Sequence, residues 1–151
     1  MASIDPYLPI IFDMAKKSEI VLEIGVHRGN TTNTILSALE KDAFLISIDK
    51  TNPIDFKTDS KQWSFIKSDC MDYIISAPVD FLMIDCDPEL ELFEKILEKY
   101  GKRVKKFMAI HDTTAYGLTE CVRKWARANK FKITKFDNVG LGFIALEHDR
   151  S

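Results

Sequence analysis

Thiols are scarce in this chain, and their arrangement excludes two structural classes. Its three cysteines (Cys70, Cys86 and Cys121) lie far apart, and no C-x-x-C pair occurs. Neither a zinc knuckle nor a disulfide framework is therefore indicated. Unpaired cysteines are typical of a protein in the reducing cytoplasm, and we expect all three to behave as small apolar core residues.

Long apolar runs are also missing. No stretch approaches the roughly 20 residues that a membrane-spanning helix needs, and the first residues lack the charged and apolar regions of a secretion signal. With 46% hydrophobic and 29% charged residues, the composition is that of a globular protein. We expect a cytoplasmic protein that does not associate with membranes.

Strong net charge is a third absence, because the formal charge is only −2 at pH 7. This value gives no overall attraction to nucleic acid. Residues 95–135 nevertheless carry twelve Lys or Arg against three acids, a local surplus of nine. Two solvated helix faces and a basic loop explain the surplus, and the alternative is a patch for an anionic partner or substrate.

The six glycines do not form a dinucleotide fingerprint. In the stretch from Val21 to Thr32 the pattern is E-x-G-x-x-x-G, whereas nicotinamide-binding turns have G-x-G-x-x-G. The stretch still predicts a strand, a tight loop and the start of a helix. Gly25 can adopt a positive φ and let a ligand approach, and Gly29 allows close packing of helix on strand. Asn30, Thr31 or Thr32 is expected to cap the helix, which leaves loop amides for a ligand.

Apolar spacing alternates between helical and strand-like periods along most of the chain. The predicted helices cover residues 5–17, 30–41, 70–76, 88–100 and 115–129, with one further short helix near 53–59. The predicted strands cover residues 19–25, 43–48, 63–67, 79–84, 104–110, 131–136 and 141–146. Asp5 and Pro6 suit the start of the first helix, and Gly101 suits the left-handed position after the helix that ends at residue 100.

This order of elements predicts an α/β fold with a mostly parallel sheet and helices on both faces. The strands are continuously apolar, as expected when both faces of a sheet are covered. A short turn at 138–140 joins the last two strands, which requires an antiparallel pair. We expect a single domain over residues 1–151, in which an N-terminal helix within residues 1–18 packs on the sheet.

Polar residues follow five of the predicted strands at the end where open α/β sheets bind ligands. They are Glu23, Asp49, Asp69, Asp85 with Asp87, and His111 with Asp112. Asp49 stands twenty residues after Gly29, where an acid can accept both hydroxyls of a ribose. The alternative for Asp49 and Asp69 is a solvated strand end or a helix cap.

Asp85, His111 and Asp112 form the most distinctive candidate cluster, because the strands that they end are predicted neighbours. Crowded carboxylates repel each other unless a cation lies between them. Mg²⁺ suits the oxygen ligands, and the imidazole also admits Mn²⁺ or another transition metal. In the alternative, His111 and Asp112 bond each other and cap the next helix.

Three segments together resemble the class I S-adenosylmethionine (SAM)-dependent methyltransferases. They are Leu22–Thr32, Phe81–Asp87 and Ala109–Thr113, within a similarity that spans residues 19–147. The likeness is to the small-molecule O-methyltransferases related to macrocin and mycinamicin sugar methyltransferases and to cephalosporin-biosynthesis proteins. It implies a three-layer, Rossmann-like, seven-stranded sheet in the order 3-2-1-4-5-7-6 with an antiparallel C-terminal hairpin.

The resemblance also implies a cofactor, a metal and their ligands. SAM would be bound by Glu23, Gly25, His27, Gly29, Thr31, Asp49, Ser68, Asp69 and Asp85. Mg²⁺ or another divalent cation would be held by Asp85, His111 and Asp112. Asp87 or His111 would take the proton of the acceptor hydroxyl.

The implied activity is metal-assisted O-methylation of a small hydroxylated molecule such as a sugar. Three departures keep an alternative open. Asp85-Cys86-Asp87-Pro88 replaces the family's Asp-Gly-x-His, Lys105-Lys106-Phe107 stands where the family has Gly-Gly, and the long insertions that form an acceptor lid are missing. A homo-oligomer could complete the acceptor site, or the chain could be a module that binds SAM or a nucleotide without methyl transfer. A nucleic-acid methyltransferase is less favoured, because the Asn/Asp-Pro-Pro-aromatic motif is absent.

Overall fold

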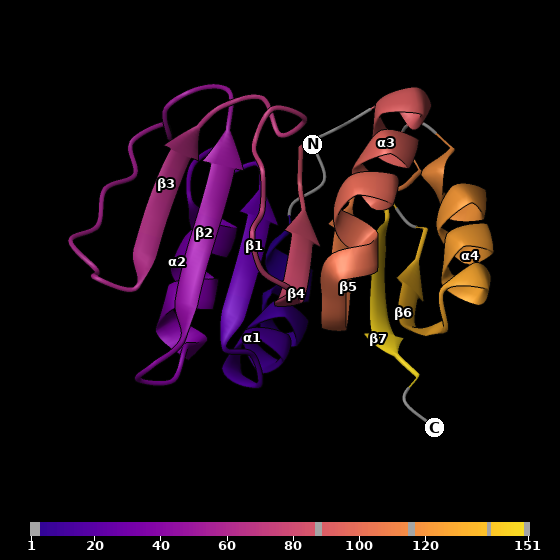
Figure 1. The fold of residues 1–151 in the computed structure, drawn as a ribbon, viewed down its shortest axis with the longest axis horizontal. Helices are drawn as coiled ribbons and strands as arrows, with labels where there is room; N and C mark the ends of the chain where they lie inside the picture. Colours follow the sequence, from indigo (N-terminus) through magenta and orange to yellow (C-terminus); the bar gives the residue numbers. More distant parts are fainter. Residues whose placement is uncertain (1–3, 87–88, 115–116, 139, 150–151) are drawn as a thin grey trace.

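The computed structural model describes residues 4–86, 89–114, 117–138 and 140–149, which form a sheet with helices on both faces (Figure 1). The strands are β1 (Ile20–Ile24), β2 (Phe44–Asp49), β3 (Trp63–Lys67), β4 (Val79–Ile84), β5 (Val104–His111), β6 (Phe131–Asp137) and β7 (Phe143–His148). The helices are α1 (Leu8–Lys16), α2 (Asn30–Ala38), α3 (Leu90–Tyr100) and α4 (Leu118–Ala128), with 3₁₀ turns η1 (Asp5–Tyr7) and η2 (Gly101–Arg103).

The seven strands follow the order β3-β2-β1-β4-β5-β7-β6. Pairs among the first five are parallel, whereas β7 pairs antiparallel with both β5 and β6. The predicted α/β fold class, strand order and antiparallel hairpin are therefore confirmed. The topology brings the carboxyl ends of β1, β2, β4 and β5 to one edge of the sheet.

Strand residues alternate between two apolar layers, which places a core on each face. On one face, Val21, Phe81 and Ala109 pack with residues of α1 and α2. On the other, Leu22 and Leu82 pack with residues of α3 and α4. Figure 1 shows the same division, with α3 and α4 in front of the sheet and α1 and α2 behind it.

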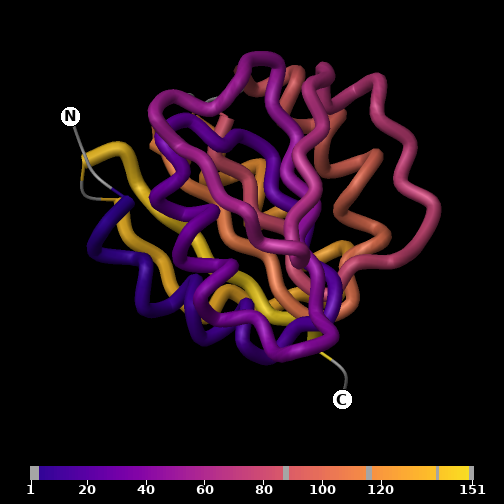
Figure 2. The backbone as a smooth tube through the Cα atoms, turned by 90° about the vertical axis from the view of Figure 1, so that its left-hand side faces the viewer, coloured from indigo at the N-terminus to yellow at the C-terminus, as the bar shows by residue number. Residues whose placement is uncertain are grey.

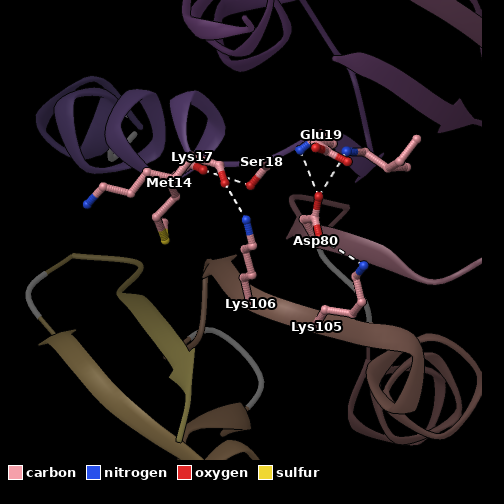
Figure 3. Close-up of polar contacts among 8 residues, drawn as sticks. Met14, Lys17, Ser18, Glu19, Asp80, Lys105 and Lys106 are labelled. Atoms are coloured by element: carbon pink, nitrogen blue, oxygen red, sulfur yellow. Dashed lines mark hydrogen bonds and ion pairs between the residues drawn. The ribbon is translucent and has the colours of Figure 1, made fainter. Parts of the chain in front are cut away.

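The amino-terminal edge of the sheet is fixed by a buried acid on β4 (Figure 3). The Asp80 carboxylate is 4% exposed and accepts hydrogen bonds from the amides of Glu19 (2.7 Å) and Ile20 (3.3 Å). Lys105 of β5 lies 3.7 Å from the same carboxylate, and Lys106 donates to the carbonyl of Lys17 at the end of α1 (2.8 Å). These contacts set the relative positions of α1, β1, β4 and β5.

Two predicted short helices, at 53–59 and 70–76, are wrong. Asp55 has a positive φ of 53°, which a helix does not allow. In the second segment, the Asp69 carboxylate accepts the amide of Met71 and forms a turn. The carbonyl groups of Cys70 and Met71 are bonded by side chains of α3, so they cannot serve a helical ladder.

The predicted behaviour of Gly101 and of the α2 cap is also wrong. Gly101 directly follows α3, as predicted, but it has a helical φ of −59° and continues into η2. Glycine is needed there because a Cβ would lie 2.5 Å from the ring of Trp125. Helix α2 begins after Gly29 (φ 79°), without a side-chain cap. The hydroxyl of Thr32 bonds Glu23 instead. A Cβ at Gly29 would lie 2.3 Å from the ring of Phe56. Glycine is therefore needed here to make room for Phe56, and not for close packing of the helix on a strand.

Candidate active site at the carboxyl edge of the sheet

A cavity of about 140 Å³ opens where β1, β2 and β3 end. Its lining combines the glycine loop after β1, the end of β2 and the turn after β3. The lining residues are Ile24, Gly25, His27, Ile48, Asp49, Lys50, Ser68, Cys70, Cys86 and Leu92. Four of them, Gly25, His27, Asp49 and Ser68, are among the predicted cofactor-binding residues.

The glycine loop is seated on the end of β4. Gly25 has a φ of 95°, and a Cβ there would lie 2.1 Å from the carbonyl oxygen of Asp85. His27 also has a positive φ, 55°, and its Nε2 lies 2.5 Å from the same oxygen. Only a residue without a side chain allows this close backbone approach, so Gly25 fixes the loop against Asp85.

The Asp49 carboxylate lies against the glycine loop, as predicted. It accepts the amide of Val26 at 2.8 Å and that of His27 at 3.4 Å, and its other oxygen accepts the amide of Thr51 at 3.1 Å. Burial acts to raise the pKa of Asp49, but these amide bonds outweigh it and lower the pKa, so the group is anionic at neutral pH.

The loop amides are therefore less available than the sequence predicts. Gly25 donates to the carbonyl of Ile48, and Gly29 donates to that of Val26. The amide of Val26 is bonded to Asp49. A ligand at this loop would consequently meet a carboxylate whose position is set by backbone amides, rather than an array of open N–H groups.

Glu23 lies below the loop and is fully buried, so it does not line the cavity. Its Oε1 accepts the hydroxyls of Thr32 (2.6 Å) and Ser47 (2.7 Å), and Ser47 in turn accepts the Trp63 indole N–H (2.9 Å). Its Oε2 has no hydrogen-bond partner among the described residues. Burial raises the pKa of Glu23 to about 7, against the effect of the two hydroxyl bonds.

The remaining predicted cofactor residues lie beside the cavity lining rather than in it. Thr31 is buried in α2, and Gly29 is covered by Phe56. The Asp69 carboxylate lies 3.5 Å from Lys50, and its hydrogen bond from the Met71 amide is the main cause of a lowered pKa. Sequence reasoning missed the lining residues Lys50, Cys70, Cys86 and Leu92, although three of them directly follow a predicted strand-end acid.

The two half-buried cysteines correct the prediction that all three belong to the core. Cys70 is buried, but Cys86 and Cys121 are partly exposed. Cys86 takes part in the cavity, and Cys121 lies in a groove between α3 and α4.

The predicted cluster of Asp85, His111 and Asp112 does assemble. One ligand atom from each residue lies within 4.8 Å of the others. His111 Nδ1 is 3.2 Å from Asp85 Oδ1 and 3.3 Å from Asp112 Oδ1. His111 and Asp112 are buried, and Asp112 has a left-handed φ of 63°. The predicted proton acceptor Asp87 lies outside the described residues.

This donor set fits a divalent cation. Two carboxylates and one imidazole converge at the end of neighbouring strands, and such a combination suits Mg²⁺ or Mn²⁺. A cation would also offset the repulsion between the two acids.

Asp85 joins the cluster to the cavity. Its carbonyl oxygen contacts the glycine loop through His27, whereas its carboxylate contacts His111. The next residue, Cys86, lines the cavity. A ligand in the cavity and a cation in the cluster would therefore lie on opposite sides of one residue.

Six of the twelve basic residues in the stretch 95–135 contact acids or backbone carbonyls of the described residues. Lys95, Lys102 and Arg123 each face an acid three or four residues earlier, and Lys99 donates to two backbone carbonyls. Lys105 and Lys106 hold the amino-terminal edge of the sheet, as described above. These contacts favour the explanation by solvated helix faces over an anion-binding patch.

Within the described ranges, every helix is too short or too polar to cross a lipid bilayer.

Searches against models of known families and against curated proteins found no match. Solved structures do match over nearly the whole chain. The O-methyltransferase TomG of Streptomyces achromogenes, solved with SAM, has a TM-score of 0.69 at 14% identity, covering 97% of this chain and 81% of TomG. The 1,6-didemethyltoxoflavin N1-methyltransferase of Burkholderia thailandensis, solved with S-adenosylhomocysteine, has a TM-score of 0.75 at 13% identity, with coverages of 98% and 79%.

A third match is a Clostridium thermocellum protein assigned as an rRNA methylase, with a TM-score of 0.68 at 16% identity, covering 95% of this chain and 97% of that one. At these identities the matches establish the fold that the chain shares with methyltransferases. They leave the activity to be argued from the site itself.

Proposed function

We propose that the chain is a SAM-dependent methyltransferase that methylates a hydroxyl group of a small molecule with the help of a divalent cation. The cofactor would occupy the cavity at the ends of β1–β3, and the cation would occupy the cluster at the ends of β4 and β5. The observation that carries the proposal is the position of Asp85, which contacts the glycine loop with its carbonyl oxygen and His111 with its carboxylate.

The cavity has a feature that suits the ribose of SAM. The ionised Asp49 carboxylate lies beside the glycine loop, where it can accept ribose hydroxyls. A cavity of about 140 Å³ is smaller than a typical closed ligand pocket of roughly 300–1,000 Å³, so a bound SAM would extend over the loop. The fold match to TomG with SAM supports this placement.

In the proposed reaction the chain mainly aligns the reactants. SAM supplies an activated methyl group on a sulfonium. Asp85, His111 and Asp112 would hold a divalent cation beside the cofactor cavity, and such a cation would supply Lewis-acid activation of an acceptor hydroxyl. The same three residues would thereby orient the acceptor toward the cofactor.

The acceptor proton needs a base near the cluster. When His111 is bound to the cation it is not available, which leaves Asp87, two residues after Asp85, as the proposed proton acceptor. The specific likeness to macrocin-type and cephalosporin-type enzymes, with a sugar acceptor, remains part of the proposal and defines the first acceptors to try.

Calorimetry with SAM, in the presence and absence of Mn²⁺, tests the two halves of the proposal separately. We expect saturable SAM binding to one site that is weakened in Asp49→Asn, and Mn²⁺ binding that is weakened in Asp85→Asn. Release of S-adenosylhomocysteine in the presence of SAM, Mn²⁺ and a panel of phenols, sugars and other hydroxylated compounds then tests turnover. Failure of SAM to bind would overturn the proposal.

A second candidate function follows from the absence of lid insertions in the chain. The chain covers 79–81% of the two small-molecule methyltransferases above, and the sequence lacks the long lid insertions expected in the family. SAM binding without turnover on any acceptor, and without dependence on Mn²⁺, would favour a SAM-binding module over an enzyme.

A further inference from the structure

A groove of about 520 Å³ runs between α3 and α4, apart from the cofactor cavity and the cation cluster. Figure 2 shows these two helices, in salmon and orange, on the side of the sheet away from the indigo start of the chain. Helix α4 lines the groove over successive turns from Glu120 to Ala128, and α3 lines it from Leu90 to Glu98. Each helix has 11 residues and is roughly 16 Å long. The groove is therefore elongated.

The floor of this α3–α4 groove is apolar and only partly shielded from water. Leu97 of α3 is buried, whereas the Trp125 ring of α4 is partly exposed. Leu90, at the start of α3, is 41% exposed. Covering such side chains is favourable, at roughly 25 cal/mol per Å² of apolar surface removed from water. The floor can therefore bind the apolar side of another molecule.

Acidic side chains dominate the rim of the groove, although residues 95–135 carry a surplus of positive charge. Glu94 and Glu98 of α3 and Glu120 of α4 line the groove, against one lysine, Lys124. Glu98 and Glu120 each lie near a basic residue three or four positions later. Glu94 forms no ion pair with any described residue. Charge complementarity therefore favours a cationic occupant.

An electrostatic contact places Glu94 opposite Cys121. Burial raises the pKa of the Cys121 thiol, and the Glu94 carboxylate raises it further. Such an effect requires a short distance between the two groups, so Glu94 of α3 faces Cys121 of α4 across the groove. The Glu94 carboxylate thus lies beside the apolar floor, and an occupant with both apolar and cationic groups would contact both.

We propose that the α3–α4 groove is the docking site for an amphipathic helix of a partner protein, whose apolar stripe covers Leu90 and Trp125. The Lys or Arg side chains that flank this stripe face Glu94 and Glu98. Helices that bind in grooves use apolar anchors at i, i+3, i+4 and i+7. The groove has the length of about three helical turns, which favours a helix over a compact small molecule. The groove is separate from the site of the proposed function and does not depend on it.

The test uses a fluorescein-labelled model peptide of about 14 Leu and Lys residues, with the leucines at i, i+3, i+4 and i+7. Fluorescence anisotropy measures its binding to the full chain at physiological ionic strength. It should bind at least about tenfold more tightly than a peptide of the same composition in scrambled order, because only the ordered peptide presents an apolar stripe. A peptide with Glu in place of Lys should also bind more weakly, since it would repel the acidic rim.

Two pairs of variants locate the binding site. Glu94→Lys should weaken binding of the Leu/Lys peptide about fivefold and strengthen binding of the Leu/Glu peptide. Glu91→Lys is its control, because Glu91 is an acid of the same helix outside the groove lining. Leu90→Ala should weaken binding about fivefold through lost apolar contact. Phe12→Ala is the matched control, because Phe12 lies on α1 and is 39% exposed.

Alkylation of Cys121 gives a second measurement on the wild-type chain, so it does not depend on the folding of any variant. The Leu/Lys peptide at about ten times its dissociation constant should slow alkylation of Cys121 by iodoacetamide about tenfold. The rate at Cys86, which lines the cofactor cavity, should not change.

Equal binding of the ordered and scrambled peptides, equal effects of Glu94→Lys and Glu91→Lys, or an unprotected Cys121 would each overturn the proposal. A wild-type chain that dimerises in sedimentation experiments, and whose Cys121 reacts only after dissociation, would assign the groove to a second copy and overturn it as well. None of these outcomes bears on the binding of SAM or Mn²⁺, so failure of the docking site and failure of the proposed function can be told apart.

Discussion

The two halves of the carboxyl edge of the sheet differ in how their polar groups are satisfied. At the ends of β1 and β2, both oxygens of the Asp49 carboxylate accept backbone amides, those of Val26 and Thr51. Glu23 is fully buried beneath this loop. At the ends of β4 and β5, two carboxylates face one imidazole. One half is organised by its own backbone, whereas the other has the donor set of a cation site.

This difference indicates two binding events that can be separated by mutation. Asp49 is held by the loop, so its loss should affect the cofactor and not the cation. Asp112 is held by the cluster, so its loss should affect the cation and not the cofactor. Only Asp85 belongs to both halves.

The largest expected effect is on the pH dependence of folding stability and comes from Glu23, which is buried beneath the glycine loop. The pKa of Glu23 is raised from 4.5 to about 7, so the folded state holds a proton that the unfolded state releases. The contribution of Glu23 to the free energy of unfolding should therefore be greatest below about pH 4.5 and should fall by roughly 3 kcal/mol as the pH rises through about 7. Urea unfolding of the wild type and of Glu23→Gln at pH 5 and pH 8 measures this contribution.

Glu23→Gln cannot ionise and keeps an oxygen that accepts the hydroxyls of Thr32 and Ser47. The difference in stability between the two pH values should be smaller in the variant by that amount. Parallel pH profiles of wild type and variant would show that Glu23 is not the titrating group.

The next largest effect is expected on Mn²⁺ binding, from a substitution in the Asp85–His111–Asp112 cluster. Asp112→Asn should lower the affinity for Mn²⁺ by about a hundredfold or more, because a charged ligand is lost. Asn also tolerates the left-handed backbone at this position, so the change should be local. Titration of free Mn²⁺ by electron paramagnetic resonance measures the loss, and calorimetry should give an unchanged SAM affinity. Unchanged Mn²⁺ affinity would contradict the cation site.

A complementary substitution, at Asp49, should weaken SAM binding without affecting the cation. Asp49→Asn should weaken SAM binding about tenfold to a hundredfold, since hydrogen bonds to a charged acceptor are lost. Mn²⁺ affinity should stay the same. Asp69→Asn is the matched control, because this side chain is 40% exposed and lies outside the cavity lining, and it should change SAM affinity by no more than about twofold. Equal losses in both variants would contradict the assigned role of Asp49.

The smallest expected effect is the protection of a cysteine from alkylation by bound SAM. Cys86 lines the proposed cofactor cavity, whereas Cys121 lies in the groove between α3 and α4. SAM at ten times its dissociation constant should slow alkylation of Cys86 by iodoacetamide about tenfold. Mass spectrometry of the labelled peptides should show an unchanged rate at Cys121, and equal protection of both thiols would argue against a ligand confined to the cavity.

The sequence predicted those features that depend on periodicity and on strand ends. Continuous apolar strands and the short final turn led to the sheet, and its order came from the resemblance to methyltransferases. The acid after each strand led to Asp49 near the loop and to Asp85, His111 and Asp112 together. These features need only the general rule that parallel strands bring their carboxyl ends to one edge.

The features that the sequence did not predict depend on contacts between distant residues. Thr32 looked like a helix cap, but its hydroxyl bonds Glu23 nine residues earlier. The segment 70–76 had helical spacing, but Lys99 and Tyr100 bond its carbonyls. The hydrogen bond from the Tyr7 hydroxyl to Asp137 gave no signal in the sequence, because the two residues lie 130 positions apart.

The most direct test of the central claim is a crystal structure of the protein with SAM and Mn²⁺. We predict an anomalous scattering peak among Asp85, His111 and Asp112, and SAM in the Gly25–Asp49 cavity with its ribose on Asp49. SAM bound elsewhere, or Mn²⁺ bound away from this cluster, would contradict it.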